Sequence, residues 1–488
     1  MSGRHGWVAF GADPVGSPTD GGLRPEFADV GRLARRGVRA VVGAARAEER
    51  PRLSQVLADH LGPEASALDV VEETWPGYDH VNVQAGLDAW LTDRRRTWRL
   101  VGIAGFQHVI FGIGDLLSIG GGNDQFGLRL ANPASVNLAS GPDAAVHPCV
   151  RCGVYLVTQG DVRTAVLLRG SAPEMGQDMV SVQIVSTDPE AAPAAAAEIR
   201  SASLEHNVFR GQVLSFGQEV FGPGQTLLQF HPRPAVAADQ LILPSETLAE
   251  VQRQVVGVAR HKDRLLAAGQ HLKRGLLLYG PPGTGKTHTV RFLTSSLVGT
   301  TVLQLSGNAM HLIAEACSVA RALQPAMLVI EDVDLIADDR GMHPGQHPLL
   351  FQLLNEMDGL AEDADVVFVL TTNRADLLEP ALAARPGRVD QAVEMALPDA
   401  PARRALFELY RGALPVDTTG LDDVIARTEG VTASFLKELL RRAALLAATR
   451  TPTSDHLEVS AADLTAALDE LLDTRNAMTR TLLGSTAD

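Results

Sequence analysis

The sequence predicts an α/β fold, with a parallel sheet covered by helices, a helical lid after it and a separate α+β region before it. Three observations support this prediction. A glycine-rich loop follows an apolar strand directly, apolar strands then alternate with helix-length spacers, and the end of the chain shows only helical periodicity. Alternation of strands and helices at such spacing is typical of parallel sheets whose crossover helices cover both faces.

We place the α/β domain at residues 241–399, the lid at 400–475 and a tail at 476–488. The strands expected in the sheet are short and apolar: Gly275–Tyr279, Val302–Leu305, Met327–Ile330, Val366–Leu370 and Gln391–Met395. The lid helices are expected at Ala402–Arg411, Asp422–Ala426, Ser434–Arg450 and Ser460–Arg475. An α/β domain followed by a helical subdomain is therefore expected.

The first 235 residues show weaker hydrophobic periodicity than the rest of the chain. Residues 1–160 are expected to be partly helical, with helices at Phe27–Arg46, Pro51–Leu61 and Ala85–Leu100. Residues 161–235 are expected to form a small α+β module, because β-branched runs flank an alanine-rich helix. Its strands are Val162–Leu168, Met179–Val185, Val213–Phe216 and Leu227–Phe230, and its helix is Pro189–Asn207.

Composition narrows the classes of partner. The 488 residues carry a net charge of −15, which disfavours a protein that mainly neutralises nucleic-acid phosphates. Three cysteines cannot build a disulfide framework, and no apolar leader follows Met1, so a cytoplasmic location is expected. The most apolar stretch, Val101–Gly122, is interrupted by polar residues and glycines, which favours a buried core segment over a membrane span.

The glycine-rich loop fits the phosphate-binding pattern G-x-x-x-x-G-K-[ST]. It reads Gly280-Pro281-Pro282-Gly283-Thr284-Gly285-Lys286-Thr287. It lies between the strand Gly275–Tyr279 and the helical stretch Val290–Leu297, which is the context that the pattern requires. In such a loop, backbone N–H groups and the helix N-terminus can bind phosphates, Lys286 can neutralise their charge and Thr287 can place its hydroxyl on Mg²⁺. The alternative is an ordinary glycine–proline turn between a strand and a helix.

Polar side chains also follow two later strands. Glu331 and Asp332 come directly after Met327–Ile330, and Asn373 follows Val366–Leu370. Carboxylates there can hold the Mg²⁺ water shell and polarise an attacking water, and an amide can position that water. Alone, the acidic pair could cap the next helix and Asn373 could be a turn residue. Ligands of parallel sheets gather at the carboxyl ends of strands, which favours the catalytic interpretation.

From Ile242 to Leu472 these motifs resemble the AAA family of ATPases, which have a P-loop nucleoside-triphosphatase fold. Gly280–Thr287 is similar to the family's Walker A motif, and the resemblance extends the nucleotide-binding segment to His288. Glu331-Asp332 is similar to Walker B and Asn373 to sensor 1. The remaining similarity covers the helix Phe351–Gly359 and the segment Thr371–Asp390, TTNRADLLEPALAARPGRVD, which resembles the family's second region of homology.

The resemblance implies a role for each motif. Thr287 and Glu331 would hold Mg²⁺, while Asp332 and Asn373 would orient the attacking water. Arg385 and Arg388 match the arginine-finger segment, which in the family reaches the ATP of a neighbouring subunit in a homo-oligomeric ring, usually a hexamer. The alternatives are a local pair of Arg388 with Asp390 and an exposed loop charge at Arg385.

The sequence departs from the family pattern at several points. Most members have Asp-Glu at Walker B, whereas here Glu331 precedes Asp332. The stretch Ser306–Ala316 lacks the aromatic–aliphatic–glycine step of polypeptide-threading members, and its Met310 and His311 could line a pore or a buried helix face. No H-E-x-x-H zinc-protease motif occurs in the sequence. At the sensor 2 position, Gly430–Ser434, there is no arginine.

One further motif could be either a metal site or a pair of free thiols. Cys149 and Cys152 form a single C-x-x-C, with His147 close by. A structural zinc site needs four ligands, so two free thiols on a strand are favoured over a metal site.

Two functional hypotheses follow. The first is an ATP-hydrolysing ring that remodels protein substrates, in the manner of a chaperone. The second is a nucleotide-switched scaffold or adaptor with little turnover. A nucleic-acid helicase or clamp loader is disfavoured by the acidic balance, and no membrane partner is expected.

Overall fold

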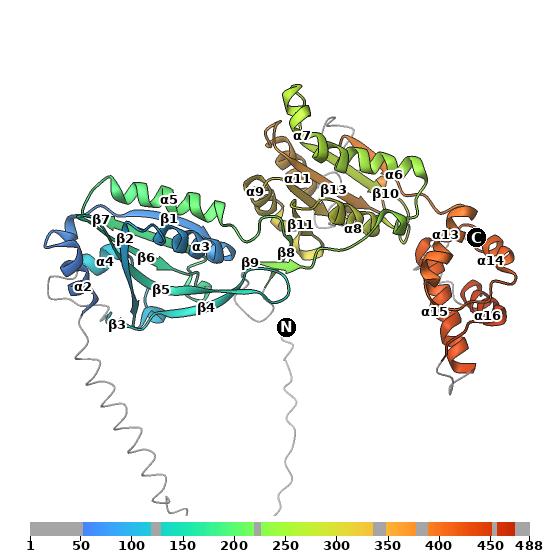
Figure 1. The fold of residues 1–488 in the computed structure, drawn as a ribbon, viewed down its shortest axis with the longest axis horizontal. Helices are drawn as coiled ribbons and strands as arrows, with labels where there is room; N and C mark the ends of the chain where they lie inside the picture. Colours follow the sequence, from blue (N-terminus) through green and yellow to red (C-terminus); the bar gives the residue numbers. More distant parts are fainter. Residues whose placement is uncertain are drawn as a thin grey trace, which may run out of the picture.

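The computed structural model describes residues 52–118, 128–218, 226–334, 348–376, 389–450 and 456–473. They form an N-terminal sheet domain, a second sheet domain and a helical subdomain at the C-terminal end (Figure 1). The helix expected at Phe27–Arg46 and the tail 476–488 lie outside the described residues.

The N-terminal domain contains a seven-stranded sheet of order β1-β7-β6-β5-β2-β3, with β4 also pairing with β5, and every pairing is antiparallel. The strands are β1 (Val71–Pro76), β2 (Arg96–Ile103), β3 (Leu130–Ala131), β4 (Ala134–Ala139), β5 (Val146–Gln159), β6 (Val162–Arg169) and β7 (Met179–Ser186). The helices are α2 (Leu53–Leu61), α3 (His80–Leu91), α4 (Ile113–Ser118) and α5 (Ala191–Glu205).

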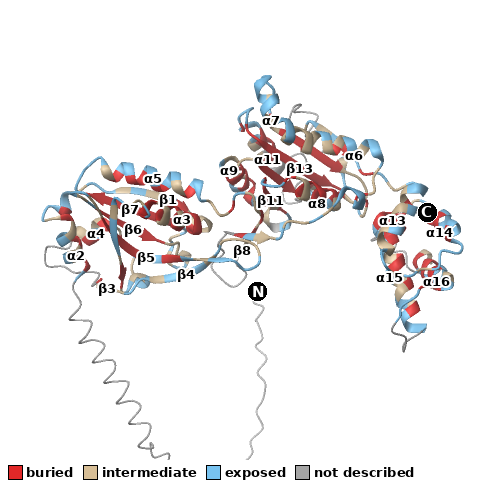
Figure 2. Cartoon of the chain, viewed as in Figure 1, coloured by how far each residue is buried: buried red, intermediate tan, exposed pale blue. Residues whose placement is uncertain are grey.

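Helices cover both faces of this sheet because its central strands are apolar on both sides. One buried cluster joins α3 and α5 to Val166 and Leu168 of β6. The other joins α2 and α4 to Ala165 and Leu167, the alternate residues of the same strand. The alternation follows from the two-residue period of a strand. The buried residues therefore form a layer on each side of the sheet (Figure 2).

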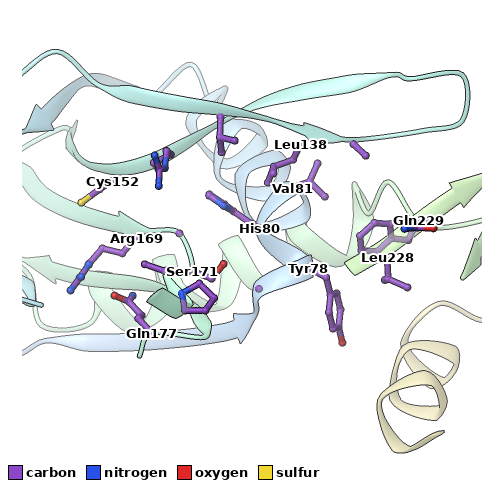
Figure 3. A pocket seen from close by; sticks show the side chains of 18 of the residues that line it. Tyr78, His80, Val81, Leu138, Cys152, Arg169, Ser171, Gln177, Leu228 and Gln229 are labelled. Atoms are coloured by element: carbon purple, nitrogen blue, oxygen red, sulfur yellow. The ribbon is translucent and has the colours of Figure 1, made fainter. Parts of the chain in front are cut away.

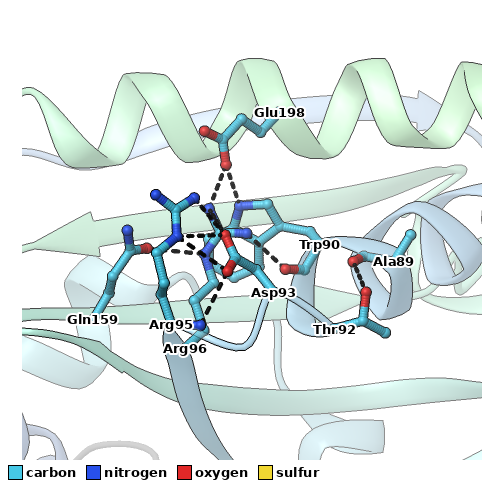
Figure 4. Close-up of polar contacts among 8 residues, drawn as sticks. All are labelled: Ala89, Trp90, Thr92, Asp93, Arg95, Arg96, Gln159 and Glu198. Atoms are coloured by element: carbon cyan, nitrogen blue, oxygen red, sulfur yellow. Dashed lines mark hydrogen bonds and ion pairs between the residues drawn. The ribbon is translucent and has the colours of Figure 1, made fainter.

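A polar cluster fastens α3 to α5 and to β2 (Figure 4). Arg96 donates to the carbonyl oxygen of Trp90 at 2.6 Å and to Glu198 of α5 at 2.6 Å, and its guanidinium lies 4.4 Å from the Trp90 ring centroid. Trp90 Nε1 also donates to Glu198, at 2.8 Å. The basic run Arg94–Arg96 thus contributes a structural anchor at Arg96, whose side chain is 8% exposed.

The second sheet has the order β14-β10-β13-β12-β11-β8-β9. Its strands are β8 (Val213–Gln218), β9 (Thr226–His231), β10 (Arg274–Tyr279), β11 (Thr301–Leu305), β12 (Ala326–Ile330), β13 (Val366–Thr372) and β14 (Gln391–Glu394). All neighbours are parallel except β8 and β9. The central strands are continuous apolar runs because both faces are buried.

Helices cover both faces of the second sheet as well. One cluster joins alternate strand residues to α9 (Ile313–Ala322) and α11 (Pro348–Asp358). The other joins the remaining strand residues to α8 (Lys286–Ser296) and α6 (Ser245–Gln252), which continues as a π-helical turn and α7 (Val258–Ala267). This three-layer α/β arrangement is the fold class predicted from the sequence. The lid helices are α13 (Ala400–Arg411), α14 (Leu421–Arg427), α15 (Ala433–Arg450) and α16 (Ala461–Leu472), with a core of their own.

Two expectations for the N-terminal part are wrong. The predicted module 161–235 is not a unit: β6 and β7 belong to the first sheet, whereas β8 and β9 extend the second. The predicted helix Ala85–Leu100 ends at Leu91, and Arg96 begins strand β2. Local periodicity could not reveal either result, because strand partners distant in the sequence decide which sheet a strand joins.

We expect the N-terminal domain to lose stability as the pH falls. His80 is 5% exposed, and burial lowers its pKa to about 4. Because the unfolded ring titrates near 6.5 and the folded ring near 4, the stabilisation is complete above 6.5 and is lost as the pH falls towards 4. Between pH 7 and pH 5 the free energy of unfolding should fall by about 2 kcal/mol.

Urea unfolding followed by tryptophan fluorescence measures this loss, because all four tryptophans precede residue 100. The His80→Gln variant should flatten the pH dependence, although His60, whose pKa burial also lowers, adds a change of the same sign. His206→Gln, which removes an exposed histidine of the same domain, is the control. An unchanged pH profile in His80→Gln would contradict the assignment.

Candidate functional site: a phosphate-binding cavity beneath the lid

Three neighbouring strands of the second sheet end side by side. In the parallel register Tyr279 of β10 pairs with Thr372 of β13, and Ile330 of β12 pairs with Leu370 of β13. The glycine-rich loop follows β10, the acidic pair follows β12 and Asn373 follows β13. The three motifs recognised in the sequence therefore meet at one edge of the sheet.

The loop has a backbone that only glycine adopts easily. Gly280 has φ +145°, and a Cβ there would lie 2.5 Å from the carbonyl oxygen of Met395. Gly283 has φ +81°, and a Cβ there would lie 3.0 Å from Oγ of Ser434 in the lid. These glycines let the loop pass close to β14 and to the lid while α8 begins at Lys286. The N-terminus of α8 then presents backbone N–H groups to an anion.

Lys286 is held inside the loop. It is 7% exposed, and its Nζ donates to the carbonyl oxygens of Gly280 and Pro281 at 2.8 and 2.9 Å. Burial lowers the pKa of Lys286, while the carboxylates of Asp332 and Asp334 act in the opposite sense. A buried ammonium bonded to carbonyl oxygens carries its full charge next to the cavity, where a phosphate would neutralise it.

The polar groups after β12 and β13 are linked to each other. Asn373 Nδ2 donates to Oδ1 of Asp332 at 3.3 Å, and the backbone N–H of Asp332 donates to Oγ1 of Thr371 at 3.1 Å. Asp332 has φ +53°, a left-handed conformation that is uncommon outside glycine. Asp334 accepts from Thr372 Oγ1 at 2.8 Å. Asp332 is exposed and lines the cavity, as a residue that polarises water requires.

Glu331 offers a test of whether the site fits a magnesium ion. Its Oε1 atom is buried and, among the described residues, has no hydrogen-bond partner. A buried carboxylate oxygen without a partner is costly unless a cation or its water shell contacts it. Thr287, at the start of α8, is exposed on the cavity wall. A hydroxyl and a carboxylate are the oxygen ligands that Mg²⁺ prefers, so these two residues fit the ion.

A cavity of about 680 Å³ lies between the glycine-rich loop and the lid, and Glu331 is not on its wall. From the predicted set, the lining includes Pro282, Gly283, Gly285, Lys286, Thr287, His288, Asp332 and Asn373. His288 also meets the carbonyl oxygen of Gln240 at 3.0 Å. Arg385 and Arg388, the predicted arginine fingers, lie outside the described residues. Gly280, Pro281 and Thr284 belong to the loop but not to the cavity wall, and Thr284 Oγ1 donates to Pro281 within it.

The lid contributes residues that the sequence alone did not reveal. Tyr410 of α13 and Lys437 of α15 line the cavity, and the backbone N–H of Ser434 donates to the Gly283 carbonyl oxygen at 3.3 Å. Ser434 and Lys437 are three residues apart on α15, so they share a helix face. The sequence did contain a signal for Lys437. The sensor 2 position Gly430–Ser434 has no arginine, but Lys437 follows it by about one helical turn and brings a positive charge to the same helix face.

Two other predicted features have structural explanations. Met310 is 5% exposed within the core beside α9, whereas His311 is exposed, so the buried helix face is confirmed for Met310. Cys149 and Cys152 both lie on β5, are buried and belong to different apolar clusters. Burial raises the pKa of each thiol to about 12. Among the described residues no group of three or more His, Cys, Asp or Glu could hold a metal ion.

Comparison with known proteins identifies the domain around this cavity. The sequence profile of the "ATPase family associated with various cellular activities (AAA)" matches residues 276–397. The chain contains a AAA ATPase domain. The match covers the glycine-rich loop, the acidic pair and Asn373, and the AAA domain uses ATP with Mg²⁺.

Curated relatives share the same part of the chain. The ATP-dependent zinc metalloprotease FtsH 2 of Sphaerobacter thermophilus is 35% identical over 52% of this chain and 39% of its own length. FtsH 3 of Symbiobacterium thermophilum is 30% identical over 52% of this chain and 42% of its own. The chain thus matches less than half the length of these relatives. Within the described residues no helix is long and apolar enough to cross a membrane.

We expect the Lys437→Ala variant to bind ATP less tightly. Lys437 is exposed on the cavity wall, so the loss of its charge should raise the KM for ATP about threefold to fivefold and change kcat less. The conservative variant Lys437→Arg should restore the wild-type KM. A KM that stays at the wild-type value in Lys437→Ala would show that the lid lysine does not contact the nucleotide.

Proposed function

We propose that the chain hydrolyses ATP in the cavity between the glycine-rich loop and the lid. The observation that carries this proposal is the meeting of Lys286, Asp332 and Asn373 at one edge of the sheet, under a lid that contacts Gly283. Lys286 and the α8 N-terminus bind the phosphates, and Thr287 and Glu331 hold Mg²⁺. When bound there, Mg²⁺ would supply positive charge to offset that of the phosphates.

In this proposal Asp332 accepts a proton from the attacking water, and Asn373 orients the Asp332 carboxylate and the water. The hydrogen bond between Asn373 and Asp332 supports the pairing of these roles. Aspartate is one methylene shorter than the glutamate usual in the family, and the left-handed backbone at Asp332 changes the direction in which the shorter side chain leaves the strand. Arg385 and Arg388 of a neighbouring copy would complete the site, which makes a homo-oligomeric ring, and by family resemblance a hexamer, the active form.

The ring would act on protein substrates as a remodelling or chaperone-like machine. The named relatives are ATP-dependent proteases, and this sequence contains no H-E-x-x-H motif, so only the ATP-driven part of their activity is proposed here. The N-terminal sheet domain packs on the edge of the AAA sheet through β9, and this packing supports a role for the domain in recognising the substrate. Three free cysteines fit the cytoplasmic location that we propose.

A nucleotide-switched scaffold is the second candidate. The Glu331–Asp332 order and the lack of an aromatic–aliphatic–glycine step in Ser306–Ala316 favour it, because both weaken the case for rapid turnover and threading. In this candidate ATP assembles the ring and an N-terminal domain recruits a partner.

Phosphate release separates the two candidates. Wild-type protein and Lys286→Ala are compared at saturating MgATP, with ring size measured by light scattering in the same samples. A machine releases phosphate well above the Lys286→Ala rate. A scaffold forms the ring with ATP but releases phosphate no faster than the variant, and protein that neither assembles nor hydrolyses would overturn both candidates.

A further inference from the structure

A second cavity, of about 780 Å³, lies where the N-terminal sheet domain meets the β8–β9 hairpin (Figure 3). It shares no lining residue with the nucleotide cavity. Its size is within the range that proteins use for small ligands and short peptide segments. Two domains build it, since Tyr78 and Leu138 come from the N-terminal domain and Leu228 from β9 of the AAA sheet.

One end of this cavity is apolar. Tyr78, Val81, Leu138 and Leu228 gather at the same end in Figure 3. Tyr78 and Leu138 pack against the core but remain only partly buried. An apolar group that enters here would remove their remaining apolar surface from water, which is the main source of affinity in such sites.

The other end carries hydrogen-bond acceptors. Gln177 Oε1 is buried and has no donor among the described residues. His80 Nε2 donates to the Val150 carbonyl oxygen at 3.0 Å, and burial keeps the pKa of the ring at about 4. The neutral ring therefore has Nδ1 as an acceptor. A buried acceptor without a donor is costly, so Gln177 Oε1 favours a ligand that brings N–H groups.

Two arginines line the cavity as well. Arg169 is 8% exposed, its guanidinium lies 4.6 Å from the Phe111 ring centroid, and it donates to the Phe111 carbonyl oxygen. Arg151 is exposed. Within the described ranges neither guanidinium has a carboxylate within 4.0 Å.

Acidic groups near these arginines do not neutralise them by contact. Asp115 and Glu72 act on Arg169 only at longer range. The acidic side chains of the cavity itself are exposed, Asp143 on a turn and Glu174 in a short 3₁₀ helix, and water screens their charge. A buried guanidinium without a carboxylate contact favours an anionic group in the ligand.

We propose that this cavity binds the C-terminal tail of a polypeptide. Apolar side chains of the tail occupy the end formed by Tyr78, Leu138 and Leu228, and the terminal carboxylate lies at the end that holds Arg151 and Arg169. Peptide N–H groups donate to His80 and Gln177, which a fatty acid could not do. The inference rests on the proposed action on protein substrates and deepens it by naming the part of the substrate that is recognised.

Fluorescence anisotropy tests this proposal on the full chain without nucleotide. The probe is a fluorescein-labelled Ser-Gly-Ser-Leu-Phe-Leu peptide, with either a free carboxylate or an amide at its C-terminus. The free acid should bind about tenfold more tightly than the amide, because a charge-assisted hydrogen bond is lost. Equal affinities for the two peptides, or no binding of either, would overturn the proposal.

Variants of cavity residues test whether the peptide binds in this cavity. Arg151→Gln changes an exposed side chain and should reduce the difference between acid and amide, because Arg169 alone then remains at that end. The exposed Arg94→Gln, outside the cavity, should leave the difference unchanged. Tyr78→Ala should weaken both peptides, with tryptophan fluorescence as the check on folding. The proposal would also be overturned if folded Tyr78→Ala bound the peptides with wild-type affinity. Saturable binding of dodecanoate by a protein that binds neither peptide would overturn it as well.

The failure of this proposal is distinguishable from failure of the ATPase proposal. Phosphate release without peptide binding would remove the tail site and leave ATP hydrolysis in place. Peptide binding without phosphate release would support the tail site and count against hydrolysis.

Discussion

The Lys286→Ala variant is expected to bind MgATP about 10- to 100-fold more weakly than the wild type, because a hydrogen bond between a charged donor and an anion contributes about 1.5–3 kcal/mol. Lys286 is the cation within the loop, and its Nζ already lies at the carbonyl oxygens of Gly280 and Pro281. Phosphates compete for that ammonium with two neutral acceptors, so the bound state gains a full charge–charge contact. Isothermal titration calorimetry measures the affinity.

The matched control for this variant is Lys273→Ala, one residue before β10 and outside the cavity. It should bind MgATP as the wild type does. Because burial lowers the pKa of Lys286, wild-type affinity should also weaken at alkaline pH earlier than an ordinary lysine would require. Equal affinities of wild type and Lys286→Ala would show that the nucleotide binds elsewhere.

The Asp332→Asn variant is expected to lose about 10²- to 10⁴-fold in turnover, the usual contribution of a positioned general base. Its affinity for MgATP should stay within about threefold of the wild type, because Asp332 acts on water rather than on the nucleotide. The substitution keeps the size of the side chain and its contact to Asn373. Single-turnover phosphate release, with calorimetry for binding, separates the two effects.

Asp363→Asn is the control, because it removes a carboxylate outside the site: Asp363 lies in the exposed loop before β13. Its turnover should equal that of the wild type. Should Asp332→Asn hydrolyse ATP at the wild-type rate while Glu331→Gln does not, the roles of the two acids would have to be exchanged.

The AAA domain was predictable because its signals are local. The glycine-rich loop needs glycine at Gly280 and Gly283 for reasons of backbone conformation and close packing, and those residues stand in the sequence. The apolar strands β10, β12 and β13 are continuous runs because they are buried on both faces. Parallel strands then place the three motifs at one edge without further information.

The N-terminal domain was not predictable in the same way. Strands β6 and β7, like β8 and β9, are short, are rich in apolar residues and pair antiparallel, yet the two pairs join different sheets. The second cavity depends on that division, because Leu228 reaches it only as part of β9. Lys437 was missed for a related reason: its position becomes meaningful only when the lid lies against the loop at Gly283.

The structure of the full chain with Mg²⁺ and a non-hydrolysable ATP analogue tests the central claim most directly. We predict that the triphosphate lies on the N–H groups of residues 283–287, with Lys286 Nζ moved from the Gly280 and Pro281 carbonyl oxygens to the phosphates and the metal between Thr287 and Glu331. A nucleotide found in the cavity beside Tyr78, or bound with Lys286 still on those carbonyl oxygens, would contradict the account.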